Sequence, residues 1–333
     1  MFTKRVAIVA GGYSSEYPVS IKSANGIKTF LEDSQYETYI VKISRDVWEV
    51  LLPDGSTSEI DKNDFTFVED ARIKKFDFAY ITIHGVPGEN GALQGYFDMI
   101  GMPYSCCGVF AAAITANKYA CNRYLSTFGV RVSPSVVIRP GDNYSVQEII
   151  DTVTLPCFVK PNEGGSSFAT TKVKEEAELA KAIEDAFGEG GNVIVEKFMQ
   201  GTEVTCGCYK TANKQVVFPI TEVVSKNEFF DYEAKYTASK VEEITPARIP
   251  AEVAKEISET TSMIYDIVGA KGIIRVDYII IDGEPYLLEV NTTPGMTVTS
   301  FIPQQIRAAQ LEPGKVLSEI IEDILQKNSY SYG

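Results

Sequence analysis

Apolar, strand-like runs alternate with helical stretches over the first 106 residues of the chain. The runs read "RVAIVAGG", "YETYIVKI" and "FDFAYITIHG", and the stretches "SIKSANGIKTFL" and "ALQGYFDMIG" have helical periodicity. Strands that alternate with helices pair mostly in parallel, because each helix carries the chain back across the sheet. This order predicts an α/β fold with a mostly parallel sheet in residues 1–106. The segment "LLPDGSTSEIDKNDF" predicts a surface excursion with a Pro-Asp-Gly turn.

Two further α+β units follow, and 333 residues are enough for three domains with their own cores. In the second unit, residues 107–196, we expect helices at 115–128, 145–151 and 174–188 and strands "SVVI", "CFVKP" and "NVIVEKF". In the third unit, residues 197–333, we expect strands at 203–210, 215–221, 272–281 and 285–290 and a closing helix at 315–327.

Composition limits the partners of the chain. The net charge is −14, which argues against general nucleic-acid binding because that needs a basic surface. No apolar run approaches the length of about 18 residues that a membrane span requires, and "KRVAIVAGG" does not have the form of a signal peptide. Six cysteines lack zinc-ligand spacing, and His84 is the only histidine. We therefore expect a cytoplasmic, thiol-reduced protein with buried cysteines and no nucleic-acid or membrane partner.

Two strand-like runs meet at a turn in "GIIRVDYIIIDGEPYLLEVN", residues 272–291. If the turn centres on Gly283, Asp277 lies opposite Glu289 and Arg275 lies opposite Asn291. Because side chains alternate between the two faces of a strand, these four side chains share one face. The other face is apolar and is expected to join the core through Val276, Tyr278, Leu288 and Val290.

The polar face of this hairpin has two interpretations. Two carboxylates directly opposite each other repel unless something neutralises them. Together with an amide oxygen they form a hard-oxygen site that suits Mg²⁺, which takes few protein ligands alongside phosphate oxygens. Alternatively, Arg275, Asp277 and Glu289 form a salt-bridge cluster at a solvated face. The hairpin alone leaves both interpretations open.

A glycine-rich segment follows the strand that ends near Lys160. In "CFVKPNEGGSSFATTKV", residues 164–167 offer bare backbone N–H groups and hydroxyls that can cradle a phosphate, although an ordinary hairpin turn has the same composition. The segment is not a Walker A loop, and "AGGYSSEYPVS" lacks the spacing of the dinucleotide-binding fingerprint. Lys118 upstream and the hairpin downstream favour the phosphate interpretation.

Ordered motifs across nearly the whole chain resemble the ATP-grasp superfamily and, within it, the D-alanine–D-alanine ligase family. The motifs are "GGYSSEYPVS", "HGVPGENGALQG", "GMPYSCCGVFAAAITANK", "FVKPNEGGSSFATTKV", "VIVEKF", "DYEAKYT", "GIIRVDYII" and "LLEVNTTPGMTVTSFIP". Each motif alone is weak evidence, but in this order they are highly specific. The resemblance implies a three-domain ATP-grasp architecture: an N-terminal substrate-binding domain (1–106), a central domain with the glycine-rich loop (107–196), and a C-terminal domain (197–333) with the hairpin and a lid at 225–245.

The resemblance also implies ligands for ATP and for two Mg²⁺ ions, with Mn²⁺ as a substitute. The metal ligands would be Asp277, Glu289 and Asn291. The residues implied to contact ATP are Lys118, Lys160 and Ser167 at the phosphates, Lys235 near the transferred phosphate, Glu196, Lys197 and Met199 at the adenine, and Glu203 at the ribose.

By the same resemblance, the expected activity is the ATP-driven joining of two D-alanines through D-alanyl phosphate, for peptidoglycan synthesis. Glu16 would receive the ammonium of the first D-alanine, and His84 would orient its carboxylate. The other implied roles fall to Arg275 and the Gly295 N–H at the oxyanion, to Ser300 and Phe301 at the second carboxylate, and to Ser166, Tyr236 and Glu16 as a latch over the closed site. Phe301 replaces the leucine that is more usual in the family.

Simpler roles exist for several of these residues when each is considered alone. Tyr236 could be a packing aromatic, Ser166 a loop hydroxyl, His84 a strand-end residue, and Glu16 a partner of the nearby helix N-terminus. For the whole chain, the alternatives are a ligase that accepts D-lactate, a non-catalytic nucleotide-binding module, and an ATP-grasp ligase for another carboxylate. The retained "EAKYT" argues against the first, and the intact hairpin argues against the second. The third should lack the Glu16, Ser166 and Tyr236 set. Family members are usually dimeric, so a homodimer is expected.

Overall fold

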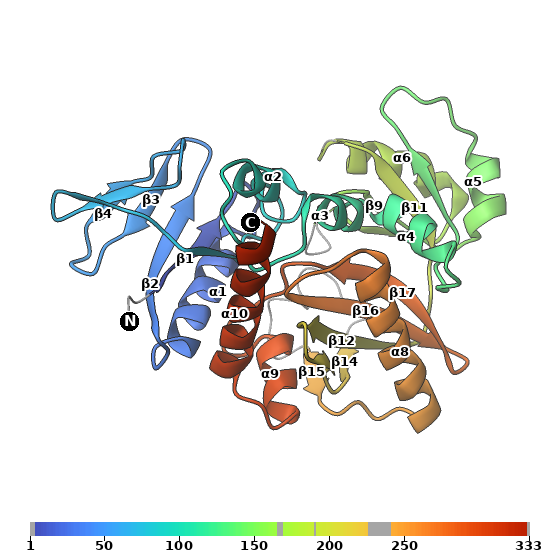
Figure 1. Cartoon of the computed structure of the whole chain (residues 1–333). Coiled ribbons are helices and arrows are strands. Elements are labelled where there is room, and N and C mark those ends of the chain that lie inside the picture. The colour runs from blue at the N-terminus through green and yellow to red at the C-terminus, as the bar shows by residue number, and fades with distance from the viewer. Residues whose placement is uncertain (1–3, 165–168, 190, 226–240, 332–333) are drawn as a thin grey trace.

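Three large sheets and a separate two-stranded pair, with flanking helices, form the described part of the structure, a computed structural model that describes residues 4–164, 169–189, 191–225 and 241–331. Figure 1 shows the first sheet at the left, the second at the upper right and the third at the lower right. The predicted α/β fold is confirmed. Within the described residues, no helix is both long and apolar enough to cross a membrane. All six cysteines are buried and free, as expected.

The first sheet has the strand order β4-β3-β2-β1-β7. Its strands are β1 (Lys4–Gly11), β2 (Tyr36–Ile43), β3 (Trp48–Leu51), β4 (Thr57–Glu59) and β7 (Phe78–Ile81). As predicted, β1 pairs in parallel with β2 and β7, whereas β3 and β4 add antiparallel strands at one edge. The predicted surface excursion therefore contributes a strand, and it leads to a separate pair, β5 (Phe67–Glu69) and β6 (Arg72–Lys74).

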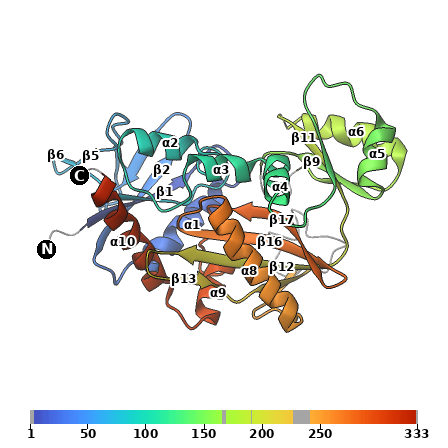
Figure 2. The same ribbon diagram turned by 45° about the vertical axis from the view of Figure 1, so that its right-hand side comes forward.

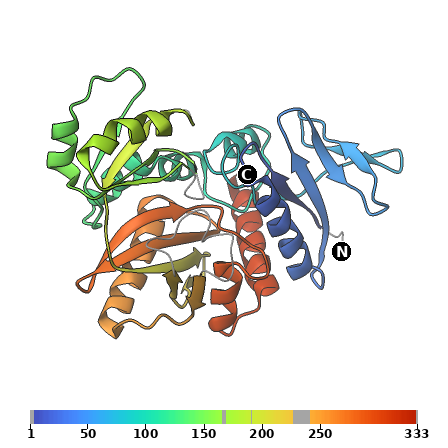
Figure 3. The same cartoon turned by 180° about the vertical axis from the view of Figure 1, so that it is seen from behind.

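The core of this first unit draws on both ends of the chain. Helix α1 (Tyr17–Phe30) packs on β1 and β2, and the terminal helix α10 (Pro313–Ser331) lies beside α1 (Figure 3). One buried cluster joins side chains of β1, β2 and α1 to Met296, Ile302, Ile306, Val316, Leu317, Ile320, Ile321 and Ile324. On the other face of the sheet, α2 (Ala92–Met99) closes a second cluster that is rich in aromatic residues. The predicted boundaries at residues 106 and 196 remain predictions, and this core crosses them.

The second sheet is antiparallel, with the order β10-β9-β11-β8. Its elements are β8 (Ser135–Ile138), α5 (Val146–Val153), β9 (Cys157–Pro161), β10 (Thr171–Val173), α6 (Glu176–Phe187) and β11 (Val193–Lys197). Valine and isoleucine side chains on one face pack against α5 and α6. The opposite face carries Lys160 and Glu196.

The prediction of a single helix at 115–128 is wrong. The chain forms two helices there, α3 (Val109–Ala116) and α4 (Lys118–Ser126). Asn117 separates them because its backbone is extended and its side chain accepts a hydrogen bond from the Ala120 N–H, at 2.9 Å. This N-cap places Lys118 at the first position of α4.

The third sheet has the order β15-β14-β12-β16-β17, with β13 paired to β12. Its strands are β12 (Thr202–Lys210), β13 (Gln215–Val217), β14 (Thr221–Ser225), β15 (Val241–Ile244), β16 (Ile273–Ile281) and β17 (Glu284–Asn291). The single strand predicted at 215–221 is thus split between β13 and β14. Helix α8 (Ala251–Ile267), which the sequence analysis did not identify, covers one face of the sheet (Figure 2). Helix α9 (Phe301–Ala308), also missed, packs against the opposite face.

The turn of the β16–β17 hairpin differs from the predicted one. Asp282 and Gly283 are the two turn residues, both with positive φ (51° and 82°), and Ile281 pairs with Glu284. Such a two-residue turn suits the twist of a hairpin. A bulge after Asp277 then shifts the pairing by one residue, so Tyr278 faces Leu287 rather than Leu288. Leu287 consequently enters the core in place of the predicted Leu288.

Contacts around β14 and β15 close the base of the predicted lid segment. The hydroxyls of Thr221 and Thr245 lie 2.7 Å apart, and the Glu222 carboxylate accepts hydrogen bonds from Arg248 Nε and Nη2, both at 2.9 Å. These hydrogen bonds from Arg248 lower the pKa of Glu222 below its ordinary value. The two ends of the segment are therefore held together whatever conformation lies between them.

We expect Glu222→Gln to lower the free energy of unfolding at pH 7, because it removes the charge that binds Arg248. The loss should be only about 1 kcal/mol, since the Arg248 side chain is mostly exposed and its charge is screened by solvent. Because the folded-state pKa is lowered, this stabilisation is present above the ordinary carboxyl pKa of about 4.3 and is lost as pH falls through the lowered value. Urea unfolding of both proteins between pH 3 and 7 measures the difference. Glu259→Gln, at an exposed pair with Lys255, is the control. Equal stabilities at pH 7 would contradict the expectation.

Candidate functional site

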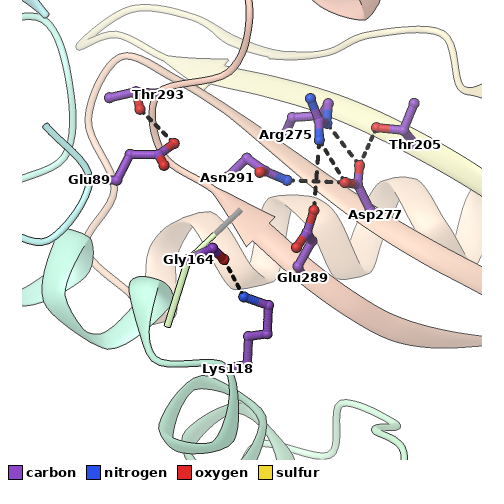
Figure 4. A network of polar contacts seen from close by, with 9 residues as sticks. All are labelled: Glu89, Lys118, Gly164, Thr205, Arg275, Asp277, Glu289, Asn291 and Thr293. Atoms are coloured by element: carbon purple, nitrogen blue, oxygen red, sulfur yellow. Dashed lines mark hydrogen bonds and ion pairs between the residues drawn. The ribbon is translucent and has the colours of Figure 1, made fainter. Parts of the chain in front are cut away.

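The polar face of the β16–β17 hairpin is assembled as the sequence predicts. Arg275 pairs with Asn291 and Asp277 pairs with Glu289 across the two strands. The bulge lies beyond this point, so the register at the polar end is the predicted one even though the turn is not centred on Gly283. Figure 4 shows these four side chains converging above the sheet.

Asp277 is the centre of a hydrogen-bond network on this face. Its carboxylate accepts from Arg275 Nε (2.8 Å) and Nη2 (2.7 Å), from Thr205 Oγ1 on the adjacent strand β12 (2.6 Å), and from Asn291 Nδ2 (3.1 Å). Arg275 Nη2 also lies 4.0 Å from Glu289 Oε1. The salt-bridge cluster considered as an alternative is therefore present, with one cation shared between two carboxylates.

The charge of Arg275 is fixed by this network. Burial opposes the guanidinium charge, but Asp277 and Glu289, together with the nearby Glu89, raise the pKa of Arg275 above its ordinary value. The arginine side chain is 17% exposed and that of Asp277 is 19% exposed. Arg275, Asp277 and Glu289 together carry one positive and two negative charges, a sum that favours a further cation beside the two carboxylates.

The donor set of this face fits a divalent cation bound together with a nucleotide. Among the described residues there is no group of three histidine, cysteine, aspartate or glutamate side chains suited to a metal. A cation here would rely on Asp277, Glu289 and the amide oxygen of Asn291, completed by phosphate oxygens. Few protein oxygens plus phosphate is the mode that Mg²⁺ favours. Metal binding would draw carboxylate oxygens away from Arg275.

Gly164, the first residue of the glycine-rich segment, lies close to helix α4. Lys118 Nζ donates a hydrogen bond to the Gly164 carbonyl at 2.5 Å (Figure 4). The fully buried Asn162 sets this approach, because its backbone carbonyl accepts from the Lys118 N–H (3.1 Å) and its side chain accepts from the Tyr119 N–H (2.9 Å). A cationic side chain and the start of the glycine-rich segment therefore meet at one helix N-terminus, which suits an anionic ligand.

The remaining residues predicted to contact ATP lie on the second and third sheets. Lys160 and Glu196, on adjacent strands, form an ion pair in which both side chains are mostly buried. Lys197, the last residue of β11, is exposed, and Met199, just beyond the strand, is partly exposed. Glu203 lies on β12 opposite Ile279, and the alternation of the strands puts it on the face that carries Asp277.

On the side of the first sheet, α1 and the loop after β7 contribute the predicted substrate residues. Glu16 immediately precedes α1. His84 is buried, and its Nε2 lies 3.4 Å from Ser23 Oγ on α1. The same hydroxyl accepts a hydrogen bond from the Met296 N–H at 3.2 Å. Ser23 therefore ties the histidine loop to the segment that follows β17.

Glu89 and Thr293 are site residues that the sequence analysis missed. Thr293 Oγ1 donates to one Glu89 oxygen, and the Gly85 N–H donates to the other, both at 2.7 Å (Figure 4). Burial raises the pKa of Glu89, an effect that the charge of nearby His84 opposes. The quoted motif "HGVPGENGALQG" contains Glu89, but loops carry no periodicity that predicts which side chains meet.

The segment after β17 brings Gly295 next to Ser300. A Cβ atom at Gly295 would lie 3.1 Å from Ser300 Oγ, so a side chain there would displace that hydroxyl. Ser300 Oγ lies 2.7 Å from Thr297 Oγ1 and accepts from the Thr297 N–H at 3.1 Å. The next residue, Phe301, places its ring centroid 5.5 Å from Arg275 Cζ.

Several predicted residues lie outside the described part of the chain: Ser166, Ser167, Lys235 and Tyr236, with most of the lid at 225–245. The latch of Glu16, Ser166 and Tyr236 therefore stays a prediction. The individual roles of the other site residues also stay predictions.

An antiparallel sheet with a glycine-rich segment, set beside a second sheet whose hairpin carries paired carboxylates, defines an ATP-grasp fold. Comparison with known proteins narrows this class. Residues 5–107 match the family profile described as D-ala D-ala ligase N-terminus, and residues 124–322 match the D-ala D-ala ligase C-terminus. The chain belongs to the D-alanine–D-alanine ligase family.

Relatives and solved structures agree with this assignment. The D-alanine–D-alanine ligase of Parabacteroides distasonis is 59% identical over 97% of this chain and 98% of its own length, and that of Phocaeicola vulgatus is 57% identical over 96% and 99%. The VanG D-Ala:D-Ser ligase of Enterococcus faecalis superposes with a TM-score of 0.85 at 32% identity, over 96% and 99% of the chains. A Bacillus anthracis ligase complexed with ATP superposes with a TM-score of 0.78 at 29% identity, over 98% and 99%.

We expect Glu289→Gln to weaken the binding of Mg²⁺–ATP at least about tenfold, because the amide removes one of two charged oxygen ligands. The melting temperature should hardly change, since glutamine keeps the shape of the side chain and relieves repulsion from Asp277. Titration calorimetry with Mg²⁺ and a non-hydrolysable ATP analogue measures the affinity. Glu284→Gln, at the turn end of the same strand, is the matched control. An unchanged affinity in Glu289→Gln would contradict the metal assignment.

Proposed function

We propose that this chain joins two D-alanines to form D-alanyl-D-alanine, driven by ATP and passing through D-alanyl phosphate, for peptidoglycan precursor synthesis. The observation that carries the proposal is the convergence of three segments at the hairpin face. They are α1 with its preceding Glu16, the loop with His84, and the segment that follows β17. The identity of 57% and 59% to two D-alanine–D-alanine ligases, over nearly the full length of the chain, supports the same reaction.

The chemistry follows from the arrangement of charges. A carboxylate is a poor acyl donor until one of its oxygens becomes a leaving group, and transfer of the γ-phosphoryl group of ATP makes it an acyl phosphate. The second amine then attacks the acyl carbon, an amide bond forms, a proton is lost and phosphate departs. Lys118, Lys160 and residues 164–167 would hold the phosphates, and catalysis of that step is mainly positioning and charge stabilisation.

The residues of this chain would also act on the acyl group and its surroundings. Arg275 and the Gly295 N–H would stabilise the negative charge that develops on the acyl oxygen. Glu16 would bind the first ammonium, and Ser300 with Phe301 would hold the second carboxylate. Mg²⁺, held by Asp277, Glu289 and Asn291, would supply charge neutralisation at the phosphates. The segment at 225–245 would exclude water, which otherwise hydrolyses an acyl phosphate.

D-Serine and D-lactate are the alternatives to D-alanine as the second substrate. The Enterococcus faecalis structure is named as a D-Ala:D-Ser ligase, so D-serine is one alternative second substrate, and D-lactate is the alternative considered from the sequence. Against D-lactate, this chain keeps "EAKYT" in the lid. We propose D-alanine at both subsites.

Phosphate release from Mg²⁺–ATP tests the reaction, with D-alanine, L-alanine, or D-alanine plus either D-serine or D-lactate, and with products identified by mass. We expect release that depends on D-alanine and yields the dipeptide. Mixed D-alanyl-D-serine as the main product would change the assigned specificity. Retained ATP binding without release for any alanine would reject the reaction and favour a nucleotide-binding module or another carboxylate substrate.

We further propose that the protein acts in the cytoplasm as a homodimer. Six free, buried thiols suit a reducing compartment, and the net charge of −14 gives no basis for a nucleic-acid partner. The homodimer rests on the family resemblance. Multi-angle light scattering should give about twice the 36.7 kDa chain mass at micromolar concentration. A mass of one chain across that range would contradict the dimer.

A further inference from the structure

The ring of Phe301 flanks the guanidinium of Arg275. The distance of 5.5 Å between Arg275 Cζ and the ring centroid lies within the range of about 6 Å in which a cation is attracted by the face of an aromatic ring. Leucine has no such face, so a leucine at this position could not make the contact.

Both partners of this contact are attached to rigid elements. Arg275 lies on β16, and Phe301 is the first residue of α9. The fully buried Gln305 fixes α9 to the sheet, because its Nε2 donates to the Thr205 carbonyl (2.9 Å) and its Oε1 accepts from the Gly207 N–H (3.0 Å). Thr205 and Gly207 belong to β12, the strand paired with β16. The ring thus keeps a set position relative to the guanidinium.

The polar contacts of Arg275 are shared with the residues assigned to the metal. Nε and Nη2 donate to Asp277, and Nη2 also faces Glu289. Under the proposed function, Asp277 and Glu289 would hold Mg²⁺, and carboxylates shared with a metal would bind the guanidinium less strongly. An aromatic ring does not bind Mg²⁺, so its contact with Arg275 persists. Within the described residues, Nη1 makes no hydrogen bond and remains for an acyl oxygen.

We propose that Phe301 is a positioning residue for Arg275. Its ring would hold the guanidinium in place while Asp277 and Glu289 bind the metal. The inference rests on the proposed function. The side chain of Phe301 would thus link the second-substrate subsite to the oxyanion site. Phe301 acts on the reaction through Arg275, in addition to any contact its backbone makes with the second carboxylate.

Two variants at residue 301 and one control test the proposal. Phe301→Leu keeps an apolar side chain but removes the ring face, and Phe301→Tyr keeps the ring. Phe110→Leu makes the same change at an exposed position on α3. Single-turnover dipeptide formation measures the chemical step, and titration calorimetry measures Mg²⁺–ATP affinity. At saturating D-alanine, we expect the single-turnover rate of Phe301→Leu to fall about tenfold with unchanged nucleotide affinity, and that of Phe301→Tyr to stay several-fold above the rate of Phe301→Leu.

A spectroscopic readout separates positioning from a general structural effect. The ring current of Phe301 should displace the Arg275 Nε–H resonance in the ligand-free protein, and Phe301→Leu should remove that displacement. Arg275→Lys identifies the resonance. Should Phe301→Leu fail to fold, Phe301→Met supplies the same comparison.

The outcomes are distinguishable from those of the proposed function. A wild-type protein without D-alanine-dependent turnover rejects the reaction itself. An active wild type with an equally fast Phe301→Leu variant overturns the positioning role. An Arg275 resonance that is the same in wild type and Phe301→Leu overturns it as well, and so does a Phe301→Tyr variant as slow as the leucine variant. Slower turnover in Phe301→Leu alone, with the resonance change, supports it.

Discussion

The ion pair between Arg275 and Asp277 is the contact on which the polar face of the hairpin depends. A buried guanidinium and a buried carboxylate each lose hydration, and the loss is offset only by good geometry and additional hydrogen bonds. Both conditions are met here, since two nitrogens of Arg275 reach the carboxylate while Thr205 and Asn291 donate to it from the strands on either side. One carboxylate thereby joins β12, β16 and β17, and Glu289 can face Asp277 without strong repulsion.

The substrate side of the site is built into the same rigid body as the hairpin. Thr293 binds Glu89, and the Met296 N–H binds Ser23, only two to five residues after β17 ends at Asn291. The second sheet is attached to the third differently. The segment before β8 contacts the third sheet and α8 through the hydrogen bond from the Leu287 N–H to the Arg131 carbonyl at 2.9 Å and through ion pairs of Arg131 with Glu256 and Glu284. The core of the second sheet is a separate buried cluster shared with α5 and α6.

Periodicity predicts the strands and amphipathic helices that carry a continuous pattern. β2, β8 and β9 have the predicted bounds, and the pairing of Asp277 with Glu289 follows from alternation alone. The failures have local causes. The Asn117 cap divides a helix, and the bulge after Asp277 exchanges Leu287 for Leu288 in the core. The pairing of Glu89 with Thr293 joins two loops 204 residues apart, and a sequence pattern holds no information about such contacts.

The terminal helix α10 gives the folding of the chain an unusual order. Val316, Leu317, Ile320 and Ile321 complete the core whose other half is formed by β1 and α1. During synthesis, β1 emerges from the ribosome about 300 residues before α10, and domains normally begin to fold as they emerge. The apolar surface of β1 and α1 therefore stays open until residues 316–321 have been made. The part of the chain that is made first can be completed only after the second and third sheets have been synthesised.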